Sequence, residues 1–465
     1  MKYNFCLTLF NKYLCSLKLL DMKVLKFGGT SVGSAVSIRN VRNIVSGQGG
    51  TKLLVLSAMS GVTNKLVEIS EKLRIGDLAT CSKIILDLKT KHFDLVDELI
   101  AEDAVNNTVK SRLNFQFDEL EQICRSNWNN QIEAKILTTG ESLLTLIFSE
   151  YLKFEGIENS LLDAKKFMQV NNLENPDTLH IGELLNDYLK SSEENDILIT
   201  QGFVRIDAKG EVNTLKRGGS DYTATILGAA IRASEIQIWT DISGLHNNDP
   251  RFVENTHPVS QLSFEEAAEL AYFGAKILHP QTISPVIGKN IPVYLKNTFT
   301  LDATGTCISA IAERKGLKAI SAKDEITAIK IKSNRMLMAH GFLRKIFEIF
   351  DKYETAIDMI TTAEIAISLT IDDCSNLELI LKELESYGEI SVDSNHSIIC
   401  IVGEGVMEDR GTSRLFEILK DVPVRMISYG GSNNNISLLV DTRNKIEVLQ
   451  KLNKKLFDDR LVSSV

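Results

Sequence analysis

A short strand that runs into a glycine turn constrains this chain more than any other feature. Residues 24–27 (VLKF) are apolar apart from Lys26, and Gly28-Gly29-Thr30-Ser31 follows, before a helical pattern of apolar residues that continues to Val45. The glycines let the backbone turn sharply and bring N–H groups close to an anion, and the next helix N-terminus adds a favourable dipole. An ammonium in a strand buried on both faces is costly unless it meets an anion. The stretch predicts a phosphate-binding turn, and the alternative is an edge lysine beside an ordinary turn.

A second turn of the same kind lies in the middle of the chain. Residues 214–221 read TLKRGGSD and precede an alanine-rich helical pattern. The planar guanidinium group of Arg217 can form two parallel hydrogen bonds to a carboxylate. Gly218-Gly219 allows the backbone to approach a bound anion closely. Ser220 or Asp221 begins the helix, so Asp221 is open to two interpretations, a helix cap or a site residue.

The composition limits the kinds of partner. With 465 residues and 44% hydrophobic content, the chain is expected to form two or three domains. A net charge of −9 provides no basic surface for nucleic acid or an anionic membrane, so substrate anions must be met by local cations. The seven cysteines are scattered without a CxxC pair, which predicts no metal site and no disulfide framework, and favours the reducing cytoplasm.

The N-terminus lacks a clear targeting signal. No apolar run reaches the roughly eighteen residues that suggest a membrane span. Residues 1–21 form an N-terminal extension without a continuous apolar core or a cleavage site, and Met22 stands just before the first strand. We expect either that translation begins at Met22 or that the extension is a loose tail.

Further strand ends carry polar residues. A buried strand at 52–56 is followed by Ser57 and Thr63, and ligands of open α/β sheets lie beyond the carboxyl ends of strands. The alternative is that Thr63 or Asn64 caps a helix that starts at Lys65, and both roles are compatible. Residues 78–128 have a charged helical pattern typical of an insert, and Glu141 then follows a glycine in a first helical turn, where a glutamate is ordinarily a dipole partner.

The last part of the first half has its own signals. A strand over 236–241 precedes the run GLHNNDPR (244–251), and 264–277 predicts an amphipathic helix that carries Lys276. A lysine near the C-terminal end of a helix most often interacts with the helix dipole and with solvent. Residues 300–315 look like a linker.

Beyond the linker the pattern changes. Strands over 328–332, 356–361 and 366–371, helices over 341–353 and 377–387, and a strand from Ser391 predict a βαββαβ unit. A similar pattern recurs 67 residues later, so that Ile427 matches Ile360. This indicates an internal duplication.

Five motifs in order resemble those of the aspartate kinases, within the amino acid kinase family: KFGGTS, TGES, KRGGSD, WTDISG with DPR, and FGAKILHP. The resemblance covers nearly all of residues 22–465. It implies an α/β fold, a three-layer αβα sandwich with a mainly parallel sheet over 22–312, followed by a regulatory region over 313–465. That region would hold two intertwined ferredoxin-like ACT domains, one at about 325–397 and one at about 398–465 together with 313–324.

The same resemblance implies the reaction and its residues. ATP would phosphorylate the side-chain carboxylate of L-aspartate, with Mg²⁺, to give 4-phospho-L-aspartate, the first step towards lysine, threonine and methionine. Lys26 and Asp221 would be catalytic. Aspartate would be held by Ser57, Thr63, Glu141, Arg217, Gly218, Gly219 and Ser220. ATP would contact Lys26, Phe27, Gly28, Gly29, Thr240, Asp241, His246, Arg251, Lys276 and Ile277, although His246 stands where the family commonly has a tyrosine.

Regulation is also implied. Two segments resemble the effector loops of lysine-inhibited enzymes, which makes lysine the expected inhibitor through Met336, Gly341, Phe342, Leu343, Ile357, Asp358, Thr362 and Glu364. A homodimer through the ACT domains is expected, with a tetramer as a further possibility. The alternatives are a glutamate, N-acetylglutamate or UMP kinase of the same fold, and a non-catalytic amino-acid sensor.

Overall fold

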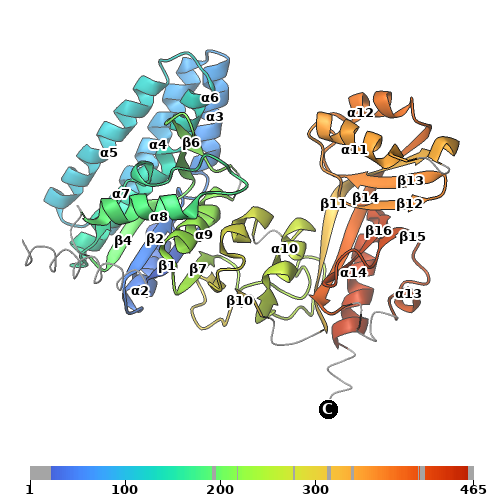
Figure 1. The fold of residues 1–465 in the computed structure, drawn as a ribbon. Coiled ribbons are helices and arrows are strands. Elements are labelled where there is room, and N and C mark those ends of the chain that lie inside the picture. Colours follow the sequence, from blue (N-terminus) through green and yellow to red (C-terminus); the bar gives the residue numbers. More distant parts are fainter. Residues whose placement is uncertain are drawn as a thin grey trace, which may run out of the picture. The chain divides into compact units, whose positions relative to one another are not determined.

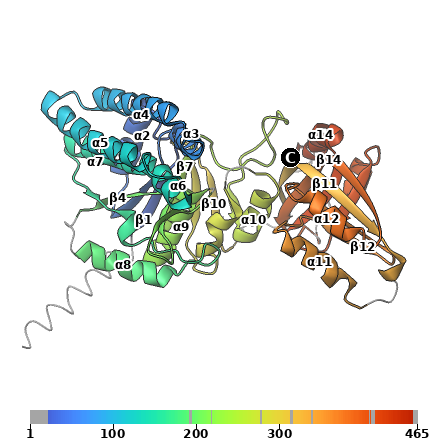
Figure 2. The ribbon, with the colours of Figure 1, turned by 90° about the horizontal axis from the view of Figure 1, so that it is seen from above.

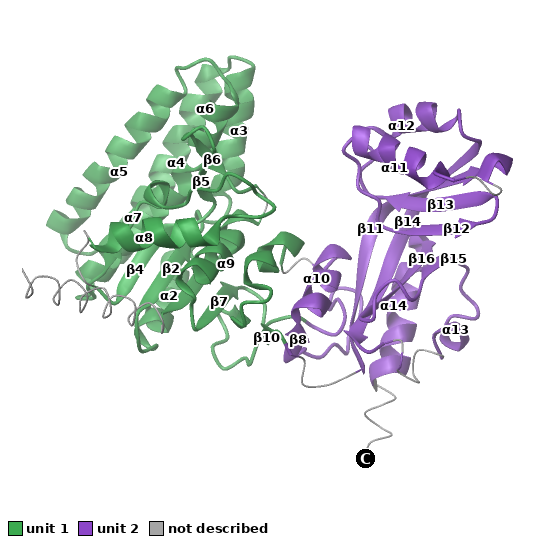
Figure 3. Cartoon of the chain, viewed as in Figure 1, with its two compact units in different colours: residues 1–245, 278–310 green, residues 246–277, 311–465 purple. Residues whose placement is uncertain are grey.

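The computed structural model describes residues 22–190, 195–216, 218–275, 278–311, 316–336, 340–406, 408 and 414–458. The chain divides into two compact units, residues 1–245 with 278–310 and residues 246–277 with 311–465 (Figure 3). The extension over 1–21 lies outside the described residues. No helix in the described ranges is long and apolar enough to cross a membrane.

The first unit is built on a mainly parallel sheet whose strands lie in the order β3-β4-β2-β1-β7-β9-β10. Strands β4, β1, β7 and β10 can be followed in this order in Figures 1 and 2. Neighbouring strands are parallel as far as β9, and β10 is antiparallel to β9. The strands are β1 (Lys23–Phe27), β2 (Lys52–Leu56), β3 (Ser160–Leu161), β4 (Ile197–Gln201), β7 (Glu235–Thr240), β9 (Val293–Asn297) and β10 (Thr306–Ser309), with a separate ribbon of β5 (Val204–Ile206) and β6 (Val212–Thr214).

Helices cover both faces of this sheet (Figure 1). They are α2 (Ala35–Ser46), α3 (Val62–Arg74), α4 (Leu78–Leu99), α5 (Asp103–Ile123), α6 (Asn130–Leu137), α7 (Thr139–Phe154), α8 (Thr178–Lys190) and α9 (Gly219–Ile231). The two long helices α4 and α5 confirm the helical insert predicted over 78–128.

The alternation of side chains along β1 decides what each residue meets. Leu25 and Phe27 are fully buried in one core with residues of α2 and α7. Val24 points to the other face, where a Cβ on Gly228 of α9 would lie 3.8 Å from its Cγ2. Lys26 is two residues from Val24 and therefore shares the α9 face. The predicted αβα arrangement is confirmed, and it turns a buried lysine towards α9.

Two local predictions for the first half were wrong, and one alternative is excluded. The alternative was a helix cap at Thr63 or Asn64, but helix α3 begins at Val62 with Gly61 at its N-cap. The helix predicted over 264–277 is α10 (Phe264–Tyr272), which ends early because Gly274 adopts a φ of +107° that a helix cannot continue. The segment interpreted as a linker contains β10, which pairs with β9.

The second unit contains one antiparallel sheet in the order β12-β13-β11-β14-β16-β15. Its strands are β11 (Gly316–Lys332), β12 (Ile360–Ala363), β13 (Ala366–Ile371), β14 (Glu389–Glu404), β15 (Val424–Ser428) and β16 (Asn435–Asp441), and its helices are α11 (Phe342–Lys352), α12 (Leu377–Leu384), α13 (Leu415–Ile418) and α14 (Lys445–Asn453). The short strand β8 (Gln261–Ser263) and helix α10 belong to this unit as well.

The duplication is visible in the architecture of this sheet. The long strands β11 and β14 pair along most of their length, and the hairpins β12–β13 and β15–β16 lie at the two ends of the sheet. One core lies under α11 and α12 and another under α13 and α14. The predicted pair of intertwined α+β units is confirmed as a fold class, although β12 begins at Ile360, four residues later than expected. The exact domain boundaries stay a prediction, since residues 246–277 pack with the second unit.

Candidate active site

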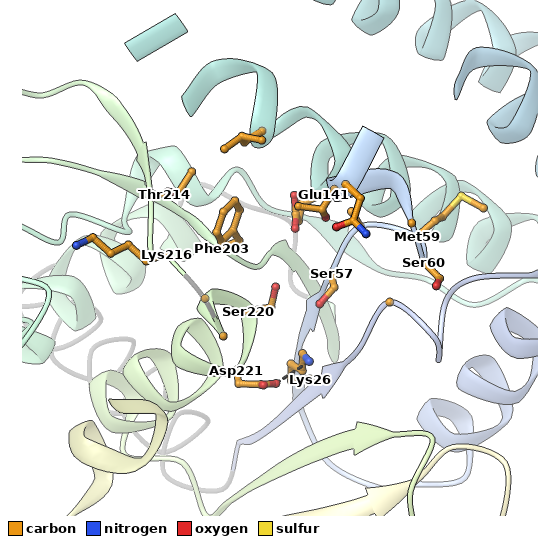
Figure 4. A pocket seen from close by; sticks show the side chains of 18 residues that line it. Lys26, Ser57, Met59, Ser60, Glu141, Phe203, Thr214, Lys216, Ser220 and Asp221 are labelled. Atoms are coloured by element: carbon orange, nitrogen blue, oxygen red, sulfur yellow. Dashed lines mark ion pairs between the residues drawn. The ribbon is translucent and has the colours of Figure 1, made fainter. Parts of the chain in front are cut away.

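A cavity of about 550 Å³ lies in the first unit, at the carboxyl ends of β1 and β2 and the start of α9 (Figure 4). Its walls come from the first glycine turn, the segment after β2, the start of α7 and the second glycine turn. They are lined by Lys26, Gly29, Ser57, Ala58, Met59, Ser60, Gly61, Thr63, Asn64, Leu137, Glu141, Phe203, Thr214, Lys216, Gly218, Gly219, Ser220 and Asp221. Chain segments nearly two hundred residues apart therefore meet in one site.

An ion pair joins the two glycine turns. The Nζ atom of Lys26 lies 2.6 Å from Oδ1 of Asp221, which stands in the first turn of α9 (Figure 4). Their side chains are only 10% and 17% exposed. The N-cap of α9 is Gly218, with a φ of +72°, so Asp221 is not the helix cap that sequence alone allowed. Its carboxylate instead neutralises a lysine that would be costly to bury alone.

The glycines keep backbone surfaces close to the cavity. A Cβ on Gly29 would lie 3.0 Å from the carbonyl oxygen of Ala58, and one on Gly219 would lie 2.5 Å from Cδ2 of Phe203. Gly28 is close enough to the lysine that a Cβ would be 3.4 Å from Nζ of Lys26. A side chain at Gly29 or Gly219 would therefore collide with neighbouring protein atoms, so glycine is needed for this close packing beside the cavity.

Glu141 is a buried acid in the wall of the cavity. It lies in the first turn of α7 and is 3% exposed, and its Oε2 atom has no hydrogen-bond partner among the described residues. Burial raises the pKa of Glu141 to about 8, while backbone N–H groups and the positive charge of Lys26 act in the opposite direction. A buried carboxyl with a free oxygen is suited to receive a cationic group of a ligand.

The remaining predicted aspartate residues gather at the same cavity. Ser57, Thr63, Gly218, Gly219 and Ser220 all line it, and Arg217 lies outside the described residues. The structure adds lining residues that the sequence did not single out, among them Ser60, Phe203 and Lys216. Lys216 has a left-handed backbone conformation (φ +62°), which no sequence pattern predicted.

The predicted ATP residues of the first unit are more dispersed. Phe27 is fully buried and stacks on Trp239 with ring centroids 6.1 Å apart, so its side chain is part of the core. The N–H of Gly28 donates to the carbonyl of Trp239 at 3.1 Å. Thr240 and Asp241 stand at the end of β7, where the hydroxyl of Thr240 donates to the carboxylate of Asp241 at 3.0 Å.

The other predicted ATP residues belong to the second unit. Nδ1 of His246 lies 2.9 Å from the hydroxyl of Thr256, and burial lowers the pKa of this histidine. Arg251 pairs with Asp249 at 2.5 Å. Lys276 and Ile277 lie outside the described residues.

The predicted effector residues also lie in the second unit. Met336, Phe342 and Ile357 contribute to the core under α11 and α12. Gly341 is the N-cap of α11, Leu343 and Glu364 are exposed, and Thr362 lies in the edge strand β12. Only Asp358 of this set makes a buried ionic contact among the described residues.

That contact is a cluster around the Asp358 carboxylate. Its Oδ1 atom accepts from Nζ of Lys323 at 2.7 Å and from the hydroxyl of Tyr272 at 2.9 Å. Burial raises the pKa of Asp358, although Lys323 opposes this shift. The other oxygen has no hydrogen-bond partner among the described residues.

No group of three or more His, Cys, Asp or Glu side chains in the described residues is arranged to hold a metal ion.

Comparison with known proteins places this geometry in a family. Residues 21–297 match the amino acid kinase family, and residues 399–456 match an ACT domain. Lysine-sensitive aspartokinase 3 of Escherichia coli is 31% identical, over 94% of this chain and all of the relative. Aspartokinase 1 of Arabidopsis thaliana, a chloroplast protein, is 33% identical over 94% of this chain and 80% of its own length.

Solved structures agree with this placement. The structure of Escherichia coli aspartokinase III with aspartate and ADP superposes with a TM-score of 0.82 at 30% identity, covering 94% of this chain and 100% of that one. The structure of aspartokinase III with lysine and aspartate gives a TM-score of 0.76. The fold and the paired glycine turns define an amino acid kinase joined to ACT domains. The chain belongs to the amino acid kinase family and, within it, to the aspartokinases.

Proposed function

We propose that this protein is an aspartate kinase, which transfers the γ-phosphate of ATP to the side-chain carboxylate of L-aspartate and gives 4-phospho-L-aspartate and ADP. The observation that carries the proposal is the buried Lys26–Asp221 pair at a cavity that also contains Glu141. A cationic side chain, Lys26, and a carboxyl group with a free oxygen, Glu141, thus line one site.

This reaction needs little proton chemistry. The carboxylate of aspartate has a pKa near 3.9, so it is ionised at neutral pH without a general base. The barrier comes from bringing two anions together in line and from the charge that moves to the leaving oxygen. Lys26 supplies positive charge where that charge develops, and Asp221 holds the lysine in place.

The substrate would be held by the surrounding walls. Glu141 is proposed to receive the ammonium group of aspartate, and Arg217 the carboxylate that does not react. Ser57, Thr63 and the backbone of Gly218 to Ser220 would complete the contacts. This assignment explains why Glu141 retains an oxygen without a partner.

ATP is proposed to enter with Mg²⁺. Mg²⁺ in nucleotide sites is bound chiefly by phosphate oxygens, water and one or two carboxylates, so it does not require an all-protein cluster. Asp221 is the acid nearest the lysine that meets the phosphates, and Mg²⁺ would supply further positive charge to the nucleotide when bound.

The proposal is tested by incubating the protein with ATP, Mg²⁺ and aspartate and trapping the acyl phosphate with hydroxylamine. We expect a hydroxamate with L-aspartate and none with glutamate or N-acetylglutamate, and no release of ADP with UMP, whose product would not react with hydroxylamine. Product from glutamate with none from aspartate would contradict the assignment of the substrate.

We further propose feedback inhibition by lysine through the ACT region, in a homodimer located in the cytoplasm. The resemblance of the effector segments supports this, and the free cysteines of the described residues suit a reducing compartment. Lysine should lower the rate of hydroxamate formation, and Asp358→Asn should weaken that inhibition. Inhibition by threonine with none by lysine would overturn the choice of effector.

A further inference from the structure

One segment of the proposed ATP site is held by the C-terminal helix of the same unit. The nucleotide loop, residues 246–258, carries His246 and Arg251 and lies within the part of the chain that matches the amino acid kinase family. It packs in the second unit. Val253 of the loop is 5% exposed and shares a hydrophobic core with Val448, Leu449 and Leu452 of α14.

Three buried asparagines join the loop to this helix. Asn247, Asn248 and Asn453, the last residue of α14, are 4%, 3% and 2% exposed. Oδ1 of Asn453 accepts from the side-chain amide of Asn247 at 3.2 Å and from that of Asn248 at 3.4 Å. Its own amide donates to the carbonyl of Asn255 at 3.3 Å. One side chain thus contacts three positions of the loop.

Asn247 in turn fixes the shape of the loop. Its N–H donates to the carbonyl of His257 at 2.8 Å, and its Oδ1 accepts from the N–H of His257 at 2.6 Å. Its carbonyl accepts from the N–H of Ile320 in β11 at 2.8 Å. These bonds between Asn247 and His257 close the loop. The side-chain amide of Asn247 then connects the closed loop to Asn453.

The chemistry of these groups explains why the arrangement is specific. A buried amide that loses its partner costs more than a surface amide, because water cannot replace the hydrogen bond. Other contacts between the helix and the loop are of different kinds: Gln450 donates to the carbonyl of Phe252 at 3.1 Å, and Nζ of Lys445 lies 4.2 Å from the Phe252 ring centroid. The asparagine cluster differs from these contacts because it consists of buried amides that bond to one another, and the amide of Asn248 also donates to the carbonyl of Leu449 at 3.3 Å.

We infer that Asn453 is a positioning residue for ATP binding: it holds the nucleotide loop in the conformation that receives ATP, although it lies about two hundred residues from the loop and belongs to the regulatory region of the sequence. The inference rests on the proposed function, because His246 and Arg251 of the loop are assigned to ATP by the resemblance to the aspartate kinases. Asn453 acts through Asn247 and Asn248, and contacts no substrate itself.

The test compares the full-length protein with three variants of α14. Asn453→Ala removes the shared acceptor, and we expect the KM for ATP to rise about tenfold, as the loss of one or two buried hydrogen bonds would give. The kcat and the KM for aspartate should stay within about twofold of wild type. Asn453→Asp keeps an acceptor for both amides and should recover part of the affinity. Lys451→Ala is the matched control, since Lys451 on the same helix pairs with Glu447 and should leave all constants unchanged.

A merely structural role predicts a different outcome. An unchanged KM for ATP in Asn453→Ala, or an equal loss for both substrates, would overturn the inference. If Asn453→Ala does not give folded protein, Asn453→Asp is judged by the same criterion, with a smaller expected rise. The dissociation constant of ADP, measured by calorimetry without aspartate, should rise in parallel. Wild type without aspartate-dependent turnover would refute the proposed function instead, and the ADP measurement would still test Asn453.

Discussion

The ammonium of Lys26 lies 2.6 Å from the carboxylate of Asp221, although these two residues are 195 positions apart in the chain. Lys26 stands near the carboxyl end of the central strand β1, and Asp221 in the first turn of α9, which covers the face to which that lysine points. A buried ion pair rarely contributes much to stability, because both charges lose water. Its position at the cavity supports the catalytic role that we propose for the pair.

Replacement of Lys26 tests this directly. Lys26→Met should reduce kcat by about a hundredfold or more, because a preorganised charge at the transferring phosphate is lost. Hydroxamate formation at saturating ATP and aspartate measures it. Lys153→Met is the control, since Lys153 lies at the exposed end of α7 and pairs with Glu150 at 3.2 Å. A comparable loss in that control would mean that the assay reports stability rather than catalysis.

Asp221 is expected to act through the lysine. Asp221→Asn should lower kcat, and the double variant with Lys26→Met should be little worse than Lys26→Met alone, because both changes disable one unit. Additive losses in the double variant would show that the two residues act independently. The four proteins should be compared under one set of conditions.

Glu141 should make both stability and aspartate binding depend on pH. Its pKa is raised from 4.5 to about 8, so between these values the folded state binds more protons than the unfolded state, and stability falls as pH rises. Glu141→Gln has no carboxyl group that titrates in this range, so it lacks this loss of stability. Its free energy of unfolding in urea, relative to that of wild type, should therefore increase from pH 5 to pH 8. A parallel pH dependence of the two proteins would contradict the raised pKa.

The same residue links pH to the substrate. If the ionised carboxylate receives the ammonium group of aspartate, the KM for aspartate of wild type should fall as pH rises from about 6.5 towards 8.5. Glu141→Gln should raise that KM about tenfold or more and remove most of the slope, since a charge-assisted bond is lost. A steeper slope in the variant would count against the assignment.

His92 should make the first unit sensitive to acid. It is fully buried in α4, its Nδ1 lies 2.7 Å from the carbonyl of Leu88, and burial lowers its pKa to about 4. Below the ordinary value of 6.5 the unfolded state binds the proton more readily, so stability is lost as pH falls from 6.5 towards 4, by at most about 1.4 kcal/mol per pH unit. His92→Leu should reduce this loss in thermal unfolding. Equal acid sensitivity of variant and wild type would refute it.

Gly274 should be intolerant of a side chain. Its φ is +107°, and a Cβ would lie 1.9 Å from the carbonyl oxygen of Ala322. Gly274→Ala should therefore destabilise the protein by about 3 kcal/mol, from backbone strain and overpacking together. Gly288→Ala is a matched control, because Gly288 also has a positive φ, +76°, but no atom lies within 4 Å of its Cβ. Similar melting temperatures for the two variants would show that the close contact is relieved without loss.

Much of the fold was predictable because its signals are local. The residues around Lys26 predicted a strand followed by a tight turn, because few other local structures fit a short apolar run that is followed by two glycines. Asp77 caps α4, and the periodicity of α4 and α5 persists over many residues. The end of α10 was missed, because its apolar pattern continues past Tyr272 and the φ of Gly274 is set by its neighbour in space.

The sequence by itself determined which residues carry charge and flexibility: a lysine in an apolar strand, two glycine pairs, and an acid after a glycine. Only the tertiary structure decided which of them meet. The pairing of Lys26 with Asp221 depends on α9 covering the Val24 face of β1, and the raised pKa of Glu141 depends on how completely α7 is buried. The contact of Asn453 with residues 247 and 248 depends on α14 packing against that loop. Such contacts arise when distant segments are brought together, and no pattern within a short window of sequence records them.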